Sequence, residues 1–270
     1  MSVAAAGAGD DRPIGVFDSG VGGLSILRAI RSELPAEDVL YIADSGHAPY
    51  GERQAAFIEE RAVAIFEFLL GHDVKAAVVA CNTATAAAVA TLRARYSVPI
   101  VAMEPAVKPA VTATKTGVVG VLATTRTLSS ARFLKLIDEH GAGVQVLIQP
   151  CPGLVEQVER GELDSAPTRA LVAQHVAPLL ARGADTLVLG CTHYPFLRSL
   201  IQEAAGPDVA LIDPAVAVAR EVRRRLTRAG LLAATREGTE RFWSSGNLDE
   251  ATRVMRKLWD PHITVHALPC

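Results

Sequence analysis

Residues 76–85 read AAVVACNTAT, an uncharged apolar run that ends in a cysteine and continues with polar residues. Small and apolar residues without a charge lead directly into Cys81, which is typical of a strand buried on both faces of a parallel sheet. Asn82, Thr83 and Thr85 begin helices well, and the alanine-rich residues 86–92 favour continuing one. We therefore expect Cys81 between a strand end and a helix start, where open α/β sheets bind ligands and where backbone N–H groups stabilise anions, including a thiolate.

A second unit of the same kind follows at residues 186–195, TLVLGCTHYP, which contain Cys191. The order strand, polar loop, helix, strand, strand with Cys occurs in residues 14–92 and again in residues 118–200. The sequence thus predicts an α/β protein of two similar doubly wound domains with mainly parallel sheets and an active site in the cleft between them. We place the first domain in residues 1–104 plus 215–270 and the second in residues 105–214, because Pro105 and Pro109 interrupt the chain.

Other elements are less regular. We expect helices at residues 24–34, 54–70, 129–140, 167–181 and 215–231, with Pro178 kinking or breaking the fourth. Two short strands, at residues 241–244 and 263–267, should end the chain. The first eleven residues lack the charged start and apolar core of a signal peptide, and we expect them to be a disordered lead-in.

Composition excludes several classes. The chain has 270 residues, half of them hydrophobic, and a formal net charge of −2. The one basic run, residues 223–225, is expected on a solvated helix face, so we predict no nucleic-acid partner. Charged residues and glycines interrupt every apolar run before it could span a bilayer, so we predict no membrane partner and a cytoplasmic protein.

The four cysteines are Cys81, Cys151, Cys191 and Cys270. None forms a Cys-x-x-Cys pair, which argues against a zinc site, and a cytoplasmic chain argues against a disulfide framework. We expect Cys151, which precedes a proline and has no matching partner, to be structural, and the terminal Cys270 to be incidental.

Two thiols on opposite sides of one small ligand suit a symmetric task. One thiol can remove a proton from one face of a carbon while the other delivers a proton to the opposite face, which inverts a stereocentre. Asp18 and His193 would accept or donate protons and position the thiols. The plainer interpretations are that the cysteines only pack in the core, that Asp18 caps a helix, that His193 is structural and that Tyr50 is an ordinary loop aromatic.

Four motifs carry a family likeness: DSGVGG at 18–23, ADS at 43–45 with PYG at 49–51, ACNTAT at 80–85 and GCTHYP at 190–195. Together they resemble the glutamate racemases, over nearly all of residues 14–214. The resemblance implies interconversion of L- and D-glutamate for peptidoglycan synthesis, with no pyridoxal phosphate, no other cofactor and no metal. It also implies a small-molecule substrate, and we expect a homodimer.

The resemblance also assigns roles. Cys81 and Cys191 would be the acid/base thiols, with Cys81 acting on D-glutamate and Cys191 on L-glutamate. The residues that would contact substrate or tune the thiols are Asp18, Ser19, Tyr50, Gly51, Asn82, Thr83, Thr192 and His193, together with Thr124 in the loop 124–127 and Glu159.

Two other functions stay open at this stage. A racemase of aspartate or another amino acid would share the two cysteines, and one methylene of side-chain length is worth only about 1–3 kcal/mol of discrimination. A thiol redox sensor or metal-binding module is the non-enzymatic alternative. Metal analysis and thiol titration separate that module from a racemase.

Overall fold

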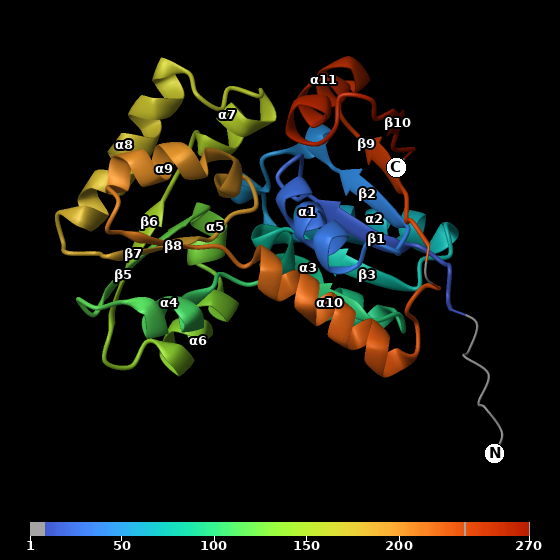
Figure 1. The fold of residues 1–270 in the computed structure, drawn as a ribbon, viewed down its shortest axis with the longest axis horizontal. Helices are drawn as coiled ribbons and strands as arrows, with labels where there is room; N and C mark the ends of the chain where they lie inside the picture. The colour runs from blue at the N-terminus through green and yellow to red at the C-terminus, as the bar shows by residue number, and fades with distance from the viewer. Residues whose placement is uncertain (1–8, 235, 270) are drawn as a thin grey trace.

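The computed structural model describes residues 9–234 and 236–269. The expectations for Cys270 and for residues 1–8 of the lead-in lie outside these residues. Within them, no helix is long and apolar enough to cross a membrane. The described chain forms two parallel β-sheets with helices on both faces of each, which confirms the predicted fold class (Figure 1).

The larger sheet has six strands in the order β10-β9-β2-β1-β3-β4, all paired in parallel. Its central strands are buried along their whole length, as expected of a sheet covered on both faces. The strands are β1 (Ile14–Asp18), β2 (Val39–Ala43), β3 (Ala76–Val79), β4 (Ile100–Ala102), β9 (Glu240–Ser244) and β10 (Val265–Ala267).

The smaller sheet has four parallel strands in the order β6-β5-β7-β8. They are β5 (Val118–Ala123), β6 (Gln145–Pro150), β7 (Thr186–Leu189) and β8 (Ala210–Ile212). This is the order of β2-β1-β3-β4 in the first sheet, so the predicted internal repeat is present in the topology. Cys81 follows β3 and Cys191 follows β7, which occupy equivalent positions beside the first strand of each set.

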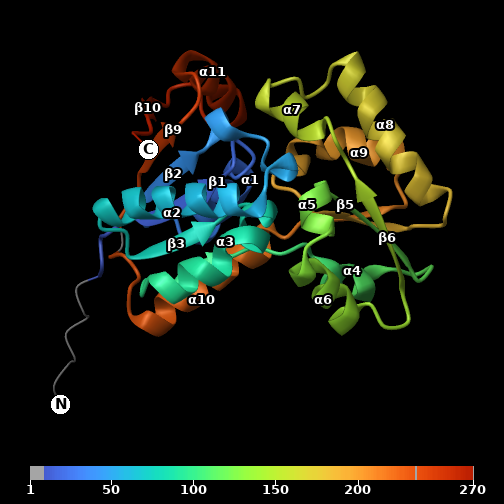
Figure 2. The same cartoon turned by 180° about the vertical axis from the view of Figure 1, so that it is seen from behind.

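Alternating side chains of the first sheet pack on different helices. Val16 contacts the core beneath α1 (Leu24–Glu33) and α10 (Ala215–Ala229), while Phe17 belongs to the core beneath α2 (Ala55–Gly71) and α3 (Asn82–Arg95). The two pairs of helices cover opposite faces of the sheet (Figures 1 and 2). Because α10 packs against α1, the chain rejoins the first sheet after β8.

The second sheet is covered in the same way. Helices α4 (Val107–Ala113) and α6 (Ala131–His140) pack together, as do α8 (Ala166–Leu180) and α9 (Arg198–Ala205). Two short helices, α5 (Thr125–Leu128) and α7 (Leu154–Glu159), follow the carboxyl ends of β5 and β6. They therefore stand at the edge of the sheet where Cys191 lies.

Three helical predictions need correction. Pro109 does not interrupt the chain but lies in the first turn of α4, where its missing N–H costs no helical hydrogen bond. Pro178 does not break α8, which runs on to Leu180, and the alternative of a kink stays a prediction. Helix α11 (Leu248–Leu258) was not predicted, although Asn247 accepts hydrogen bonds from the backbone N–H groups of Asp249 and Glu250 and so caps it.

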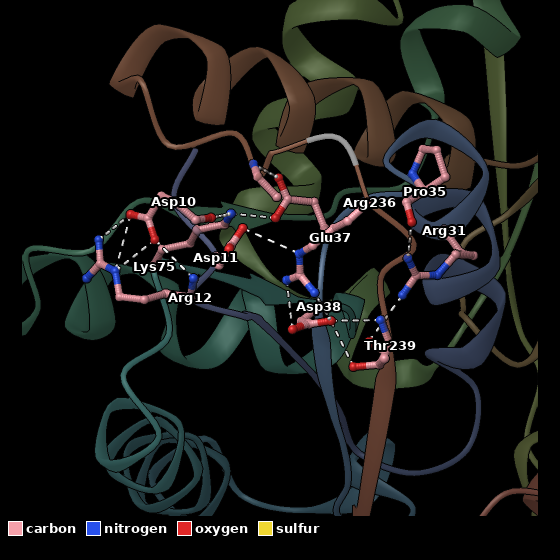
Figure 3. Close-up of polar contacts among 11 residues, drawn as sticks. Asp10, Asp11, Arg12, Arg31, Pro35, Glu37, Asp38, Lys75, Arg236 and Thr239 are labelled. Atoms are coloured by element: carbon pink, nitrogen blue, oxygen red, sulfur yellow. Dashed lines mark hydrogen bonds and ion pairs between the residues drawn. The ribbon is translucent and has the colours of Figure 1, made fainter. Parts of the chain in front are cut away.

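A polar network at the amino ends of the strands fastens the returning chain (Figure 3). The buried Lys75 ammonium lies 2.5 Å from the carboxylate of Glu37, whose other oxygen accepts a hydrogen bond from the backbone of Ala233. Asp38 accepts hydrogen bonds of 2.8 Å from both the backbone and the hydroxyl of Thr239. The segment before β9 is thereby tied to the strands it must join.

Candidate active site

Cys81 is the N-cap of α3. Its sulfur accepts a hydrogen bond from the backbone of Ala84 at 3.4 Å, and its thiol can donate to Ser19 Oγ at 3.6 Å. Burial raises the pKa of the thiol, and the charge of Asp18 acts in the same direction, whereas the contacts with Ala84 and Ser19 lower it. The expected thiolate stabilisation by the helix is therefore present but weaker than desolvation. A raised pKa favours the thiol form of Cys81, the form that donates a proton.

Asp18 ends β1, the strand beside β3, and is fully buried. It accepts a hydrogen bond from the backbone of Gly23 at 2.8 Å, and the Thr192 hydroxyl lies 3.4 Å from its Oδ1. Burial raises the pKa of Asp18 to about 6, against the opposing effect of His193. A carboxyl group with a pKa near neutrality can exchange protons with a neighbour at physiological pH.

Cys191 belongs to a second arrangement. Its sulfur lies 3.6 Å from Nδ1 of His193, and Nε2 of the same ring lies 2.6 Å from Oε1 of Glu159. Burial of His193 disfavours its charge, but the contacts with Cys191 and Glu159 outweigh burial and raise its pKa well above the ordinary value. Carboxylate, imidazole and thiol thus form a chain along which a proton can be held or moved.

The Glu159 carboxylate also reaches the first sheet. It accepts a hydrogen bond of 2.7 Å from the backbone of Val21, in the loop after β1, and one of 3.0 Å from Ser45 Oγ. A Cβ atom at Gly20 would lie 1.9 Å from Oε1 of Glu159. The absence of a side chain at this position in the loop 18–23 is therefore what allows Glu159 to approach.

Three threonines connect the two halves. The Thr83 hydroxyl, in the first turn of α3, lies 2.9 Å from that of Thr124 and 3.2 Å from that of Thr127, which are themselves 2.9 Å apart. Thr124 is the N-cap of α5. A Cβ atom at Gly51 would lie 3.0 Å from Cβ of Thr124, so the glycine also permits close approach at this point.

Two further predicted residues differ in their polar contacts. The Tyr50 hydroxyl donates to Asp44, which is also paired with Arg61 at 2.8 Å, so Tyr50 is anchored by its hydroxyl group. The Asn82 side chain is only 4% exposed, and within the described chain neither its oxygen nor its nitrogen has a hydrogen-bond partner. A buried amide without partners retains its full capacity to bind a polar ligand.

These residues surround one narrow cavity between the two sheets. Both cysteines line it, and they are only 4% and 7% exposed. The lining residues are Ser19, Pro49, Tyr50, Gly51, Cys81, Asn82, Thr83, Thr124, Val155, Gly190, Cys191, Thr192 and His193. Of the predicted site residues, Asp18 and Glu159 do not line it, and they contact Thr192 and His193 from behind.

Some features of the site carried no signal that could have identified them. Val155 lines the cavity from α7 as an ordinary apolar residue.

Cys151 does not line the cavity; its thiol donates to the backbone oxygen of Gln149 at 3.2 Å, and burial raises its pKa. Within residues 9–234 and 236–269, no group of three or more His, Cys, Asp or Glu side chains is placed to bind a metal ion.

Known proteins are similar to this chain in sequence and in fold. The family model described as Asp/Glu/Hydantoin racemase matches residues 14–222, and the chain belongs to this family. A glutamate racemase of Methylococcus capsulatus is 56% identical over 262 residues, which cover 97% of each chain. Among solved structures, a glutamate racemase of Bacillus anthracis has a TM-score of 0.88 at 35% identity, covering 96% of this chain and 98% of that one. These similarities place the chain, more narrowly, with the glutamate racemases, which are isomerases.

A third comparison includes a ligand. The structure of Escherichia coli glutamate racemase in complex with L-glutamate and the activator UDP-MurNAc-ala has a TM-score of 0.83 at 30% identity. The similarity covers 95% of this chain and 98% of that one.

Proposed function

We propose that this protein interconverts L- and D-glutamate by a two-base mechanism in the cavity between the two sheets. One observation carries the mechanism: Cys81 and Cys191 come from equivalent positions in different sheets and line the same cavity. A pair of acid/base groups from two sides is what inversion at one carbon requires. The similarity to glutamate racemases, one of them bound to L-glutamate, supports the substrate.

The steps balance in protons. With L-glutamate, the Cys191 thiolate takes the α-proton, the Cα–H bond breaks, and the electron pair remains on Cα. The Cys81 thiol then gives its proton to the opposite face of Cα and becomes the thiolate. The reverse reaction begins with that thiolate and D-glutamate. Assignment of Cys81 to D-glutamate and of Cys191 to L-glutamate rests on the family resemblance.

The residues around the two thiols have two roles: some support proton transfer at a thiol, and others bind the substrate. Asp18 supports Cys81 from the first sheet, and His193, backed by Glu159, supports Cys191 from the second. The two carboxylates of the substrate require hydrogen-bond donors because the cavity is buried. Ser19, Asn82 and Thr192 supply such donors, as do Thr83 and Thr124, while Tyr50 and Gly51 complete the wall.

We also propose a division into domains, a role for the product and an oligomeric state. The division into domains 1–104 plus 215–270 and 105–214 is supported by which strands form each sheet. D-glutamate made in the cytoplasm would serve peptidoglycan synthesis. The enzyme would act as a homodimer without pyridoxal phosphate or metal, and sedimentation equilibrium tests the oligomeric state.

The direct test is chiral chromatography of purified, dialysed and chelator-treated protein incubated with L-glutamate in D₂O. We expect D-glutamate carrying deuterium at Cα, while unreacted L-glutamate gains little label early in the reaction, because each thiol exchanges its own proton. Equal early labelling of both enantiomers would contradict two bases. Activity that depends on added pyridoxal phosphate or metal would contradict the cofactor-free mechanism, and faster turnover of aspartate would reassign the substrate.

A further inference from the structure

Helices α11 and α7 are neighbours (Figures 1 and 2) and line one pocket, although α11 follows a strand of the first sheet and α7 a strand of the second. Two cationic side chains of α11 bond to the backbone of the turn that follows α7. The Arg253 guanidinium donates to the backbone oxygen of Arg160 at 3.2 Å, and the Lys257 ammonium donates to that of Gly161 at 2.7 Å. Arg253 and Lys257 are four residues apart, so they project from one face of the helix.

The acceptors belong to the turn that ends α7. Gly161 has φ of +75°, in the left-handed region that favours glycine, and its N–H bonds back to Val158. Carbonyl groups at the end of a helix and just beyond it have no partner within the helix, and cationic side chains are favourable donors to them. Arg253 and Lys257 therefore complete the end of α7 from the opposite side of the cleft.

This turn immediately follows Glu159. A displacement of the end of α7 would move the Glu159 carboxylate away from His193, Val21 and Ser45. The end of α11 is tied down as well: Arg28 of α1 donates to the backbone oxygen of Leu258 and lies 5.9 Å from the centre of the Phe196 ring in the second half. The contact between α11 and the turn after α7 thus joins two segments that are each held in place, the first by Arg28 and the second by the hydrogen bonds of Glu159.

We propose that Arg253 and Lys257 are positioning residues which latch α7 onto the first sheet, hold Glu159 against His193, and keep the cleft over the two cysteines closed between turnovers. They contact neither thiol and act through Glu159. The effect on catalysis rests on the racemase function proposed above. The effect on closure does not, because it concerns only the access of solvent to the cleft.

Closure can be measured without turnover. Native protein is treated with iodoacetamide, and the alkylation rates of Cys81 and Cys191 are followed by peptide mass mapping. In the double variant Arg253→Ala/Lys257→Ala we expect both rates to rise about threefold to thirtyfold, because two hydrogen bonds from charged donors are lost. Arg256→Ala is the matched control, since Arg256 lies on the same helix but bonds to Ile263 within the first half. Unchanged rates in the double variant would overturn the latch.

Two further measurements exclude a general loss of folding. The conservative variant Arg253→Lys/Lys257→Arg should restore slow alkylation, and the melting temperatures of the double variant and of Arg256→Ala should be similar. With α-deuterated substrates, the double variant should show a larger rise of the isotope effect for L-glutamate than for D-glutamate, because support of Cys191 is weakened. Faster alkylation without the isotope asymmetry would refute positioning of Glu159, whereas a protein inactive on glutamate would refute only the proposed function.

Discussion

Glu159 and His193 form a contact of 2.6 Å whose carboxylate is shared with the other half of the molecule. The same Oε1 atom accepts a hydrogen bond from the backbone of Val21, and Oε2 accepts one from Ser45. Glu159 and His193 both belong to the second half, and the hydrogen bonds from Val21 and Ser45 orient the carboxylate toward the imidazole while the two halves are together. Protonation of His193 and closure of the cleft are coupled through this one carboxylate.

The variant Glu159→Gln should lower the pKa of His193, because the contact with Glu159 is one of the two that raise it. We expect kcat to fall by at least about tenfold, a part of the 10²–10⁴-fold that a positioned acid or base contributes. The alkaline limb of kcat against pH should also move to lower pH. Glu162→Gln, at an exposed residue nearby, is the control. An unmoved pH profile would show that Glu159 does not set the protonation of His193.

The variant Asp18→Asn should gain stability while it loses activity. Burial raises the pKa of Asp18 from 3.8 to about 6, so the folded state binds the proton more tightly than the unfolded state. Protonated Asp18 therefore contributes fully to the free energy of unfolding below about pH 4, and this contribution is lost as pH rises from about 4 to about 6. Above pH 6 the charged carboxylate costs up to about 3 kcal/mol, at about 1.4 kcal/mol for each pKa unit.

Urea unfolding of wild type and Asp18→Asn at pH 4.5 and pH 8 measures this cost. The variant should be the more stable protein at pH 8, and the difference should shrink at pH 4.5. Asp208→Asn, at an exposed position, should show no such pH dependence. A variant that is less stable than wild type at pH 8 would mean that the hydrogen bonds of the carboxylate outweigh its desolvation.

The variants Cys81→Ala and Cys191→Ala should each abolish racemisation, because inversion by two bases needs a thiol on both faces. Cys151→Ala, which removes a buried thiol outside the cavity, should stay active. Rates are measured from both enantiomers by circular dichroism. Substantial racemisation by either of the first two variants, together with an inactive Cys151→Ala, would show that the wrong pair had been chosen.

Asp18 and His193 should affect different proton transfers. Enantiomers have equal free energy, so kcat/KM must be the same in both directions in every variant, and a simple rate comparison cannot separate the two roles. With α-deuterated substrates, Asp18→Asn should raise the isotope effect more for D-glutamate, whose α-hydrogen Cys81 takes. His193→Asn should raise it more for L-glutamate. The opposite asymmetry, or none, would reject this pairing and leave the two-thiol mechanism intact.

Local signals predicted the sheets well. The uncharged apolar runs before Cys81 and Cys191 specify buried parallel strands whatever surrounds them, and the structure has strands at both. Helix α11 was missed although its signals are present: Asn247 as cap, acidic residues in the first turn and basic residues in the last.

Contacts between distant segments could not be predicted in this way. The contact of Glu159 with Val21 joins residues 138 positions apart, and it depends on how two separately built sheets dock. Val155 is equally hidden, because an apolar residue on a helix reads the same whether it faces a core or a cavity. The threonine contacts across the cleft likewise depend on α5, a single turn that no periodicity reveals.

The pairing of β2 with β9 has a consequence for folding while the chain is being synthesised on the ribosome. Asp38, just before β2, bonds to Thr239, just before β9, and 201 positions separate them. At about 5–20 residues per second, β2 waits roughly 10–40 s for its neighbour while the whole second sheet is made. Until then β2 is an open edge, the kind of surface that invites wrong pairing. The sheet that begins first is completed last, and a chain truncated before residue 240 would keep that edge exposed.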